Sequence, residues 1–441
     1  MFKPHRIALL KRSAARYARD PAGPVFPLLP CLTTQSDSMS SEKFSMFGTV
    51  AFGFVMTFSS GPGQTFFISL FNQDLRQAFS LSHGQIGSLY FAGTLTSALC
   101  IIWAGKLLDE IDLGRYTLMV CSGLTTAAVV MSFTNGPIML AVAFFLLRLF
   151  GQGLSGHTGI TTASRAPRVY RGRAISYSGL GFSAAEILMP VITVSLLSIY
   201  SWREVWRMVA GFELFIIVLA SQYLLSHYRI SNHPVGQNIT DNICNSWTRR
   251  QVTRDPRFWL IAPAIFAPLV ISTGLFFHQQ NLAQHKGFTF PVWASAIAAY
   301  SITAVLTSLL TGTAVDRWSG ARVVKFYLLP FIAAVLIATY LHNSALPFIY
   351  YALMGMTVGI ATPSVSALWI ELYGTAHIAS IRSLTHAMMV VGTALGPVIF
   401  GTLLDANFSW EFILICCAAW MSVATLLLSR PSLTYLSVQN S

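Results

Sequence analysis

The sequence predicts an all-α membrane protein whose twelve transmembrane helices form two six-helix pseudo-repeats. Of its 441 residues, 54% are hydrophobic and only 10% are charged, and the mean hydropathy is +0.60. A soluble domain carries about a quarter charged residues. The apolar residues are gathered in runs of the roughly 20 residues needed to cross a ~30 Å hydrocarbon core, and the two halves of the chain share a repeated pattern.

Residues 1–43 form a basic N-terminal extension that we expect to be disordered. Its first part, MFKPHRIALLKRSAARYARD, is rich in arginine and almost free of acids. A transit peptide or a basic membrane-surface arm has this composition. The alternative, which we favour, is that translation starts later, at Met39 or Met46. We expect no cleavable secretory signal before the first span.

Two groups of six spans follow the extension, in residues 44–226 and 258–430. A polar, basic linker (227–257) separates them, and a short tail (431–441) ends the chain. We expect the spans near 45–71, 84–104, 116–135, 138–160, 174–198, 205–226, 258–280, 290–312, 323–342, 345–370, 379–403 and 410–429.

The net charge of +12 is explained by membrane topology. With both termini in the cytoplasm, most Lys and Arg residues fall on the cytoplasmic side, as the positive-inside rule requires. Those that fall outside are Arg76, Arg203, Arg207 and Lys286. The excess of basic residues therefore does not indicate a nucleic acid partner. The six cysteines show no metal-ligand or disulfide spacing, and we expect no metal and no cofactor.

An internal repeat supports duplication of a six-span unit. The stretches GKLLDEIDLGR (105–115) and GTAVDRWSGAR (312–322) share the pattern G-x3-D-x5-R at an offset of 207 residues. The same offset relates Pro190 in the fifth span to Pro397 in the eleventh. Two parallel six-span repeats are a transporter architecture.

The motifs resemble those of the major facilitator superfamily. The repeated loop pattern is similar to the family's loop signature. RLFGQG (148–153) resembles the family's fourth-span motif, particularly in the monocarboxylate and oxalate–formate branches, and GLGFSAAEILMP (179–190) resembles its fifth span. The resemblance covers about residues 45–430 and implies the major facilitator fold. The acidic start of the first span and the charged eighth span of monocarboxylate transporters are missing here.

The repeated loops are candidates for gating. A carboxylate at a helix end can be held by a basic residue and by neighbouring helix N-termini, which would latch one side shut. The alternative is that these loops only fix topology. The residues concerned are Gly105, Asp109, Arg115, Gly312, Asp316 and Arg322.

The first span contains SSGPGQT (59–65) near the middle of the membrane. Its Gly-Pro-Gly sequence breaks helical hydrogen bonding, and such a break is tolerated in a bilayer only against protein or a watery cavity. Ser60, Gln64, Thr65 and, in the fourth span, Gln152 would then offer polar groups to a substrate. The alternative is a kink that serves packing.

Three charged residues lie within the spans of the first half. From the span ends, Arg148 and Glu186 lie about 16 Å and 10 Å below the outer surface, within reach of each other. Glu213 lies at about 9 Å depth. Charges in spans face the bundle interior and usually mark a pathway. Arg148 and Glu186 are either a structural ion pair or an anion anchor beside a protonatable carboxylate. Glu186 and Glu213 are the candidates for proton coupling.

These features indicate a secondary active transporter that works by alternating access, not an enzyme. No G-x4-GK[ST] nucleotide motif is present, so we expect an ion gradient or solute exchange, and not ATP, to drive transport. Our first expectation is proton symport of a small, monocarboxylate-like organic anion. The charged residues of the first half would hold the charged end of the solute, and the second half its apolar end. The alternatives are proton-coupled efflux of amphipathic compounds, a non-transporting membrane sensor and a membrane-embedded enzyme. We expect a monomer in a bacterial inner membrane.

Overall fold

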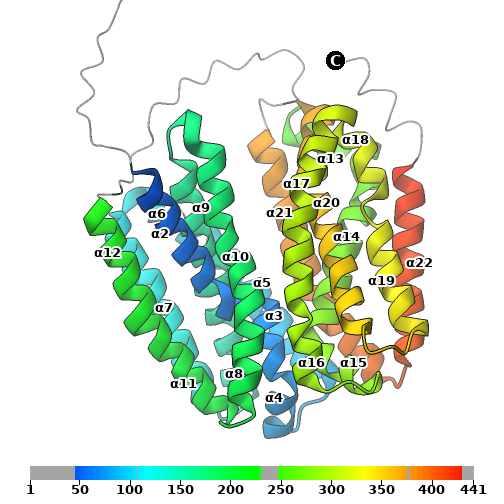
Figure 1. Cartoon of the computed structure of the whole chain (residues 1–441), viewed down its shortest axis with the longest axis horizontal. Coiled ribbons are helices and arrows are strands. Elements are labelled where there is room, and N and C mark those ends of the chain that lie inside the picture. Colours follow the sequence, from blue (N-terminus) through cyan, green and yellow to red (C-terminus); the bar gives the residue numbers. More distant parts are fainter. Residues whose placement is uncertain (1–44, 106, 229, 231–246, 375–377, 430–441) are drawn as a thin grey trace, which may run out of the picture. The chain divides into compact units, whose positions relative to one another are not determined.

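The structure is a computed structural model that describes residues 45–105, 107–228, 230, 247–374 and 378–429. Every regular element in these residues is a helix, and no strand occurs among them (Figure 1). The predicted all-α class is therefore confirmed. The N-terminal extension, most of the linker and the C-terminal tail lie outside the described residues.

The first half contains six spans, several of them built from more than one helical segment. In chain order the elements are α2 (Met46–Ser59), η2 (Gly61–Gly63), α3 (Thr65–Ile68), η3 (Ser69–Phe71), α4 (Asn72–Phe79), α5 (His83–Ala104), α6 (Leu107–Glu110), α7 (Leu113–Ser132), α8 (Pro137–Leu146), η4 (Leu147–Ser155), α9 (Gly156–Ser164), α10 (Arg168–Leu197), α11 (Trp202–Phe212), η5 (Glu213–Ile217) and α12 (Val218–Tyr228). Segments η2 and η3 are 3-10 helices, whereas η4 and η5 are π-helices inside the fourth and sixth spans.

The second half contains six further spans. Its elements are α13 (Arg249–Arg254), α14 (Pro256–Phe277), α15 (Gln279–His285), α16 (Phe290–Ser295), α17 (Ile297–Trp318), α18 (Gly320–Val323), η6 (Val324–Phe326), α19 (Leu329–Tyr340), α20 (Leu346–Tyr373), α21 (Ile378–Asp405) and α22 (Trp410–Leu428). The repeated prolines, Pro190 and Pro397, lie inside α10 and α21 as the duplication predicts.

Ten helices in the described part of the chain are long and apolar enough to cross a membrane by themselves. The first two spans complete the predicted twelve. The first is divided by the break at Gly61–Gly63, and the second, α5, carries several polar side chains. Large apolar side chains such as Ile138, Leu309 and Leu426 are 84%, 69% and 70% exposed, respectively, as expected for lipid-facing positions.

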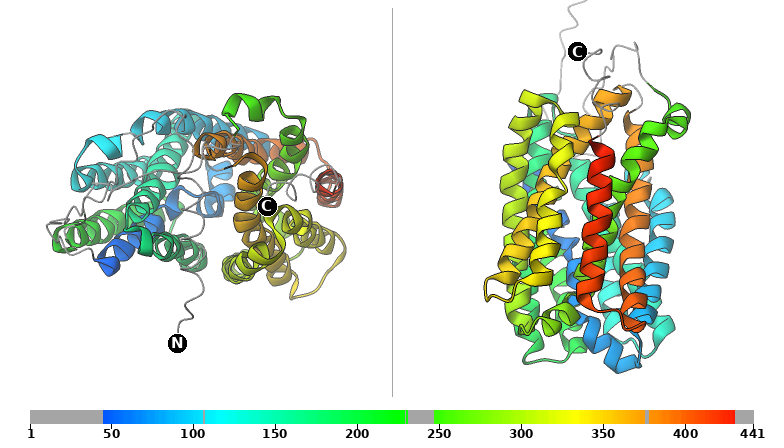
Figure 2. Two further views of the ribbon diagram at one scale, coloured as in Figure 1. Left: turned by 90° about the horizontal axis from the view of Figure 1, so that it is seen from above. Right: turned by 90° about the vertical axis from the view of Figure 1, so that its right-hand side faces the viewer.

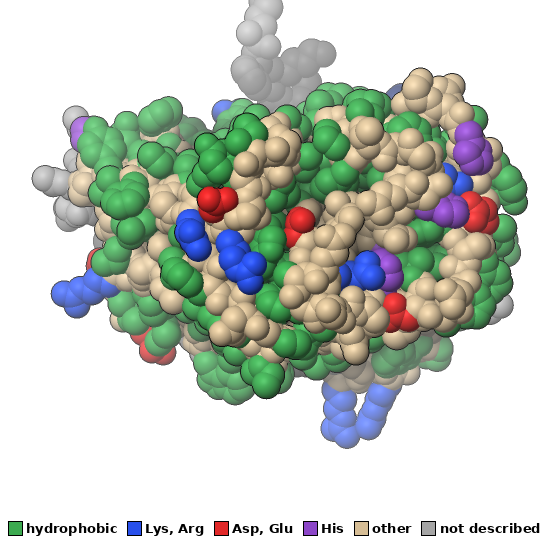
Figure 3. Space-filling model, turned by 90° about the horizontal axis from the view of Figure 1, so that it is seen from below, with side chains coloured by type: hydrophobic (Ala, Val, Ile, Leu, Met, Phe, Trp, Pro, Cys, Tyr) green, Lys and Arg blue, Asp and Glu red, His purple; other side chains and the backbone are tan. Residues whose placement is uncertain are grey.

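The helical body has two faces where the helices turn. We call the face with α6, α13 and α18 the α6 face, and the opposite face with α4, α15 and α16 the α4 face (Figure 1). Helix α2 begins and α22 ends at the α6 face, as an even number of spans requires (Figure 1). On the α4 face, charged and histidine side chains lie among hydrophobic ones (Figure 3).

Each half packs its helices closely, and two helix pairs make the most extensive contacts between the halves. Within the halves, α2 lies along α10 and α17 lies along α20. Between them, α5 lies along α21 and α10 along α17 (Figure 2). The α5–α21 contact is a close approach of main chains, because a Cβ atom on Gly401 would overlap the main-chain oxygen of His83. The pairs that join the halves are the elements that must move if the halves rock against each other.

Candidate functional site

The first span is broken where the sequence predicts. Helix α2 ends at Ser59, the 3-10 segment Gly61–Gly63 follows, and a new helix starts at Thr65 after an extended Gln64. Pro62 has no N–H group to donate and stands between two glycines, which weaken a helix, and together these residues interrupt the regular helical ladder. The break exposes main-chain polar groups in the interior of the first half.

The broken segment rests directly on the π-helical segment of the fourth span. A Cβ atom on Gly63 would overlap the main-chain oxygen of Leu147, and one on Gly151 would lie 2.7 Å from the Cα of Gly63. The two main chains can approach this closely because neither glycine has a side chain. Single π-helical turns inside α-helices are frequent at functional sites.

Arg148 lies at this contact and is only 2% exposed. Its Nη1 donates to the main-chain oxygen of Gly63 at 3.2 Å. The carbon of its guanidinium lies 5.3 Å from the centre of the Tyr90 ring, a cation–π arrangement. Among the described residues its buried Nε finds no hydrogen-bond partner. A main-chain carbonyl and an aromatic ring thus hold a buried positive charge.

The predicted ion pair between Arg148 and Glu186 is not formed in this structure. Glu186 accepts a hydrogen bond of 2.5 Å from Ser301 of α17 instead. No ion pair of Arg148 with a carboxylate occurs within the described residues. Similar depths in the membrane do not bring two side chains together, because each helix also has its own rotation about its axis. The side chain of Arg148 is directed at the first span, and that of Glu186 at the second half.

A cavity of about 180 Å³ lies between the first span and α10. Two of the predicted substrate-binding residues, Ser60 and Gln64, line it together with the half-buried Glu186. The remaining walls are Gly61, Phe66, Phe182 and Ala185. The cavity therefore combines a carboxyl group, an amide and a hydroxyl group with an apolar wall.

The other predicted binding residues, Arg148, Thr65 and Gln152, do not line this cavity. Thr65 shares a hydrogen bond of 2.7 Å with the hydroxyl of Tyr90, the same ring that packs against Arg148. Gln152 is half-buried, and its main-chain nitrogen lies at the contact with Gly63. Thr65 therefore connects the broken segment to Tyr90, and Gln152 packs against that segment.

Glu213 is fully buried at the start of the π-helical segment of the sixth span. Its Oε2 accepts a hydrogen bond of 2.8 Å from Ser59, the last residue of α2. Its Oε1 has no hydrogen-bond partner among the residues described. The carboxyl group is therefore attached to the first span immediately before the break.

The second half contains a larger and mostly apolar cavity of about 420 Å³. Aromatic and other apolar side chains dominate its lining, among them Pro268, Tyr300, Tyr327, Phe331, Met354 and Trp369. Tyr300 is the neighbour of Ser301, which donates to Glu186. The wall of the apolar cavity thus adjoins the carboxyl group of the first half.

Side-chain hydrogen bonds close the α4 face between the two halves. The carboxylate of Asp405 accepts bonds from the Ser82 hydroxyl (2.6 Å), the His83 main-chain nitrogen (2.9 Å) and the Gly84 main-chain nitrogen (2.7 Å). It therefore caps α5 from the end of α21, at the positive end of the helix dipole. Further bonds between the halves run from Asn72 to Phe277 O, from Gln279 to Ser69 and from Gln284 to Gln73.

The predicted gating residues lie on the opposite, α6 face. Arg115, Asp316 and Arg322 are exposed, and a Cβ atom on Gly312 would meet no atom within 4 Å. Gly105 ends α5, and the side chain of Asp109 lies outside the described residues. Two other acids cap helices here: Asp112 accepts from the main chain of Arg115, and Glu371 accepts from Gly320 and Ala321.

The residues that sequence reasoning missed are Asp405, Ser301 and Tyr90. Asp405 was recognisable in the sequence. It is an acid at the end of one span, and the other half contains a helix that begins after a serine and that a carboxylate can cap. Ser301 and Tyr90 carried none, since serine and tyrosine are common in apolar spans.

The sequence profile of the Major Facilitator Superfamily matches residues 53–297 and 274–436, which is most of the chain. The chain belongs to the Major Facilitator Superfamily. No curated protein matches it. Among solved structures, a bacterial homologue of the human lysosomal transporter Spinster, in an inward-facing and occupied conformation, has 15% identity and a TM-score of 0.61. That match covers 89% of this chain and 96% of the other.

The nucleoside transporter NupG is also similar in fold, with 13% identity and a TM-score of 0.68, covering 89% of this chain and 100% of the other. Membership of the Major Facilitator Superfamily makes this protein a multi-pass membrane transporter of a small solute that works by alternating access. The resemblance found from the motifs is confirmed. The family is one of transporters, so the alternative of a membrane-embedded enzyme is rejected.

Proposed function

We propose that the protein is a proton-coupled symporter of a small organic anion that has an apolar body. One observation supports this most strongly: the guanidinium of Arg148 is buried and forms no ion pair with a carboxylate among the described residues. A buried charge without an oppositely charged partner destabilises the folded protein. An anionic solute would supply the missing partner.

Arg148 has the hydrogen-bonding capacity for this role. A guanidinium has five N–H donors, and a planar fork that fits a carboxylate. The Gly63 carbonyl uses one of them, and the Nε is free of partners in the described structure. In the proposed cycle, movement of the broken segment withdraws the carbonyl, and the carboxylate of the solute replaces it. Ser60, Gln64, Thr65 and Gln152 would contact or support the solute there.

Glu186 is the proposed proton carrier, with Glu213 as a second buried acid. Glu186 bonds across the halves to Ser301 at 2.5 Å. Loss or gain of its proton changes the charge at the boundary that must open and close during transport. The apolar cavity beside Tyr300 would accept the body of the solute.

The apolar cavity of about 420 Å³ also favours a second candidate, proton-coupled efflux of amphipathic compounds. The two functions differ in the direction of the coupled flux. For either, we propose a monomer in a bacterial inner membrane, with both termini and the α6 face in the cytoplasm.

The test is flux of labelled monocarboxylates of increasing chain length into proteoliposomes, with an imposed pH gradient. The wild type should accumulate the solute against its concentration gradient. Glu186→Gln should lose this accumulation and keep exchange of internal for external solute. Glu110→Gln, at an exposed acid of the α6 face, is the matched control and should behave as the wild type. Accumulation by Glu186→Gln would refute the proton role, and absence of flux with every solute would favour a sensor.

A further inference from the structure

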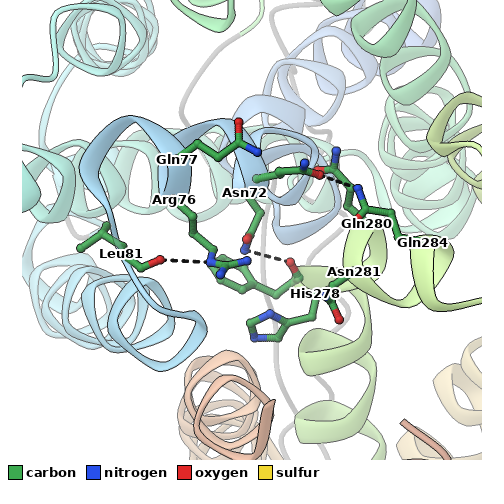
Figure 4. A pocket seen from close by; sticks show the side chains of 10 residues that line it. Asn72, Arg76, Gln77, Leu81, His278, Gln280, Asn281 and Gln284 are labelled. Atoms are coloured by element: carbon green, nitrogen blue, oxygen red, sulfur yellow. Dashed lines mark hydrogen bonds between the residues drawn. The ribbon is translucent and has the colours of Figure 1, made fainter. Parts of the chain in front are cut away.

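A second cavity, of about 210 Å³, lies at the α4 face between the two halves. Its walls come from α4 of the first half and from α14 and α15 of the second (Figure 4). Six of its lining residues are amides: Asn72, Gln73, Gln77, Gln280, Asn281 and Gln284. We call it the amide cavity. It is separate from the cavity of about 180 Å³ between the first span and α10, which we call the central cavity and with which it shares no lining residue.

The amide cavity contains one cationic group with unused donors. Arg76 lines it and donates its Nε to the main-chain oxygen of Leu81 at 3.2 Å (Figure 4). The carboxylate of Asp405 accepts from Ser82, His83 and Gly84, and no ion pair of Arg76 occurs within the described residues. The remaining N–H groups of Arg76 are therefore available to an oxyanion.

Two hydrogen-bond acceptors on residues that line the same cavity have no hydrogen-bond donor among the described residues. His278 is 1% exposed and its Nε2 bonds to the main-chain oxygen of Pro397 at 2.9 Å. Because a carbonyl only accepts, Nε2 carries a proton, and in the neutral imidazole Nδ1 is an acceptor. This Nδ1 and the Oε1 of Gln280 are buried without hydrogen-bond partners among the described residues. Buried polar groups of this kind are normally hydrogen-bonded.

We propose that the amide cavity is a second binding site, for a small hydroxycarboxylate. The carboxylate would accept from Arg76, and the hydroxyl group would donate to His278 Nδ1 or to Gln280 Oε1. A solute bound here touches both halves. It would therefore hold the α4 face closed and slow transport without competing for the central cavity.

The chemistry can be tested with three probes: glycolate, which has both groups, acetate, which has only the carboxylate, and ethylene glycol, which has only hydroxyl groups. Thermal unfolding of the purified full-length protein in nanodiscs should shift upward with glycolate, by about 1–3 °C near saturation. Acetate and ethylene glycol at equal concentration and ionic strength should give smaller shifts. Equal shifts with all three probes would refute the proposal.

Variants locate the site. Arg76→Gln should abolish the glycolate shift, whereas Arg207→Gln, at an exposed arginine outside the cavity, should retain it. If Arg148→Lys abolishes the shift and Arg76→Gln does not, glycolate binds in the central site. That outcome would overturn this inference and support the proposed function, so the two can fail separately.

A second measurement does not depend on the folding of Arg76→Gln. Gln77 is exposed and lines the cavity, and Ala78 is exposed on the same helix outside it. Glycolate should slow alkylation of Gln77→Cys several-fold, measured on the labelled peptide by mass spectrometry. Alkylation of Ala78→Cys should not change. Equal rates for Gln77→Cys with and without glycolate would refute binding at this face.

Discussion

The guanidinium of Arg148 donates to the main-chain oxygen of Gly63 across 3.2 Å, inside the first half of the protein. This bond joins the fourth span to the break in the first span. A main-chain oxygen carries only a partial negative charge, so it satisfies the hydrogen-bonding group but does not neutralise the cation. The arrangement keeps a charged donor in place while leaving its charge available.

Replacement of Arg148 by lysine should weaken binding of an anionic solute by about 1–3 kcal/mol, because the charge remains and the planar fork is lost. Equilibrium binding of the transported solute to purified protein measures this. Arg207→Lys, at an exposed arginine, should leave the affinity unchanged. Unaltered affinity in Arg148→Lys would argue against direct contact with the solute.

The double variant Arg148→Ala/Glu186→Ala distinguishes a structural ion pair from an anion anchor. Because Arg148 and Glu186 form bonds to different partners, removing both should not restore transport lost in Arg148→Ala. Vesicle flux is the measurement. Restored flux would show that the two residues form an ion pair in another state of the cycle and neutralise each other's charge.

The main-chain contact between Gly63 and the fourth span should not accept a side chain. A Cβ atom there would overlap Leu147 O, so Gly63→Ala should destabilise the protein by about 1–3 kcal/mol and separate Arg148 from its carbonyl partner. Gly172→Ala is the matched control, because a Cβ atom there meets nothing within 4 Å. Thermal unfolding of both variants tests this, and equal midpoints would contradict the observed packing.

Asp405 should stabilise closure of the α4 face. Asp405→Asn removes the negative charge at the N-terminus of α5, which is worth about 0.3–1 kcal/mol at a helix end. Spin labels at the exposed positions Ala78 and Thr289 should then show a larger population at long distance in pulsed electron paramagnetic resonance. Glu110→Gln, at an exposed acid on the other face, should leave the distances unchanged. An identical distribution in Asp405→Asn would show that this cap does not contribute to closure.

The apolar cavity of the second half should set the size of the accepted solute. Ala361 lines it and is half-buried, so Ala361→Phe should fill part of its volume. Uptake of long-chain solutes should fall at least tenfold, while uptake of the shortest ones should change little. Ala419→Phe, on an exposed side of α22, controls for the added ring. A uniform loss across chain lengths would mean that the cavity does not hold the solute.

The spans and the break in the first one were predictable from sequence because both depend on local properties. Hydropathy places the spans, and the Gly61-Pro62-Gly63 sequence combines a missing N–H group with two residues that weaken a helix. The duplication, too, was visible in Gly105, Asp109 and Arg115 and their counterparts 207 residues later.

Contacts between helices were not predictable in the same way. Depth in the membrane follows from counting residues, but the direction of a side chain follows from the rotation of its helix. Arg148 and Glu186 therefore have suitable depths and different partners. Asp405 and Asp316 likewise look alike at the ends of their spans. Both side chains are exposed, and only the packing of α21 against α5 makes the first a helix cap, whereas Asp316 lies on the other face.

The π-helical segment Leu147–Ser155 has a consequence for insertions and deletions. A π-helical turn holds one residue more than the α-helical hydrogen-bonding pattern allows, so a single deletion there restores regular winding without breaking the span. The remainder of the span, from Gly156 on, would then keep its orientation relative to the helix before the deletion, because the wide π-helical turn and the α-helical turn that replaces it each complete one full rotation. Homologues that lack one residue in this segment would keep both the fold and the helix faces that flank the segment, and would lose only the wide turn itself.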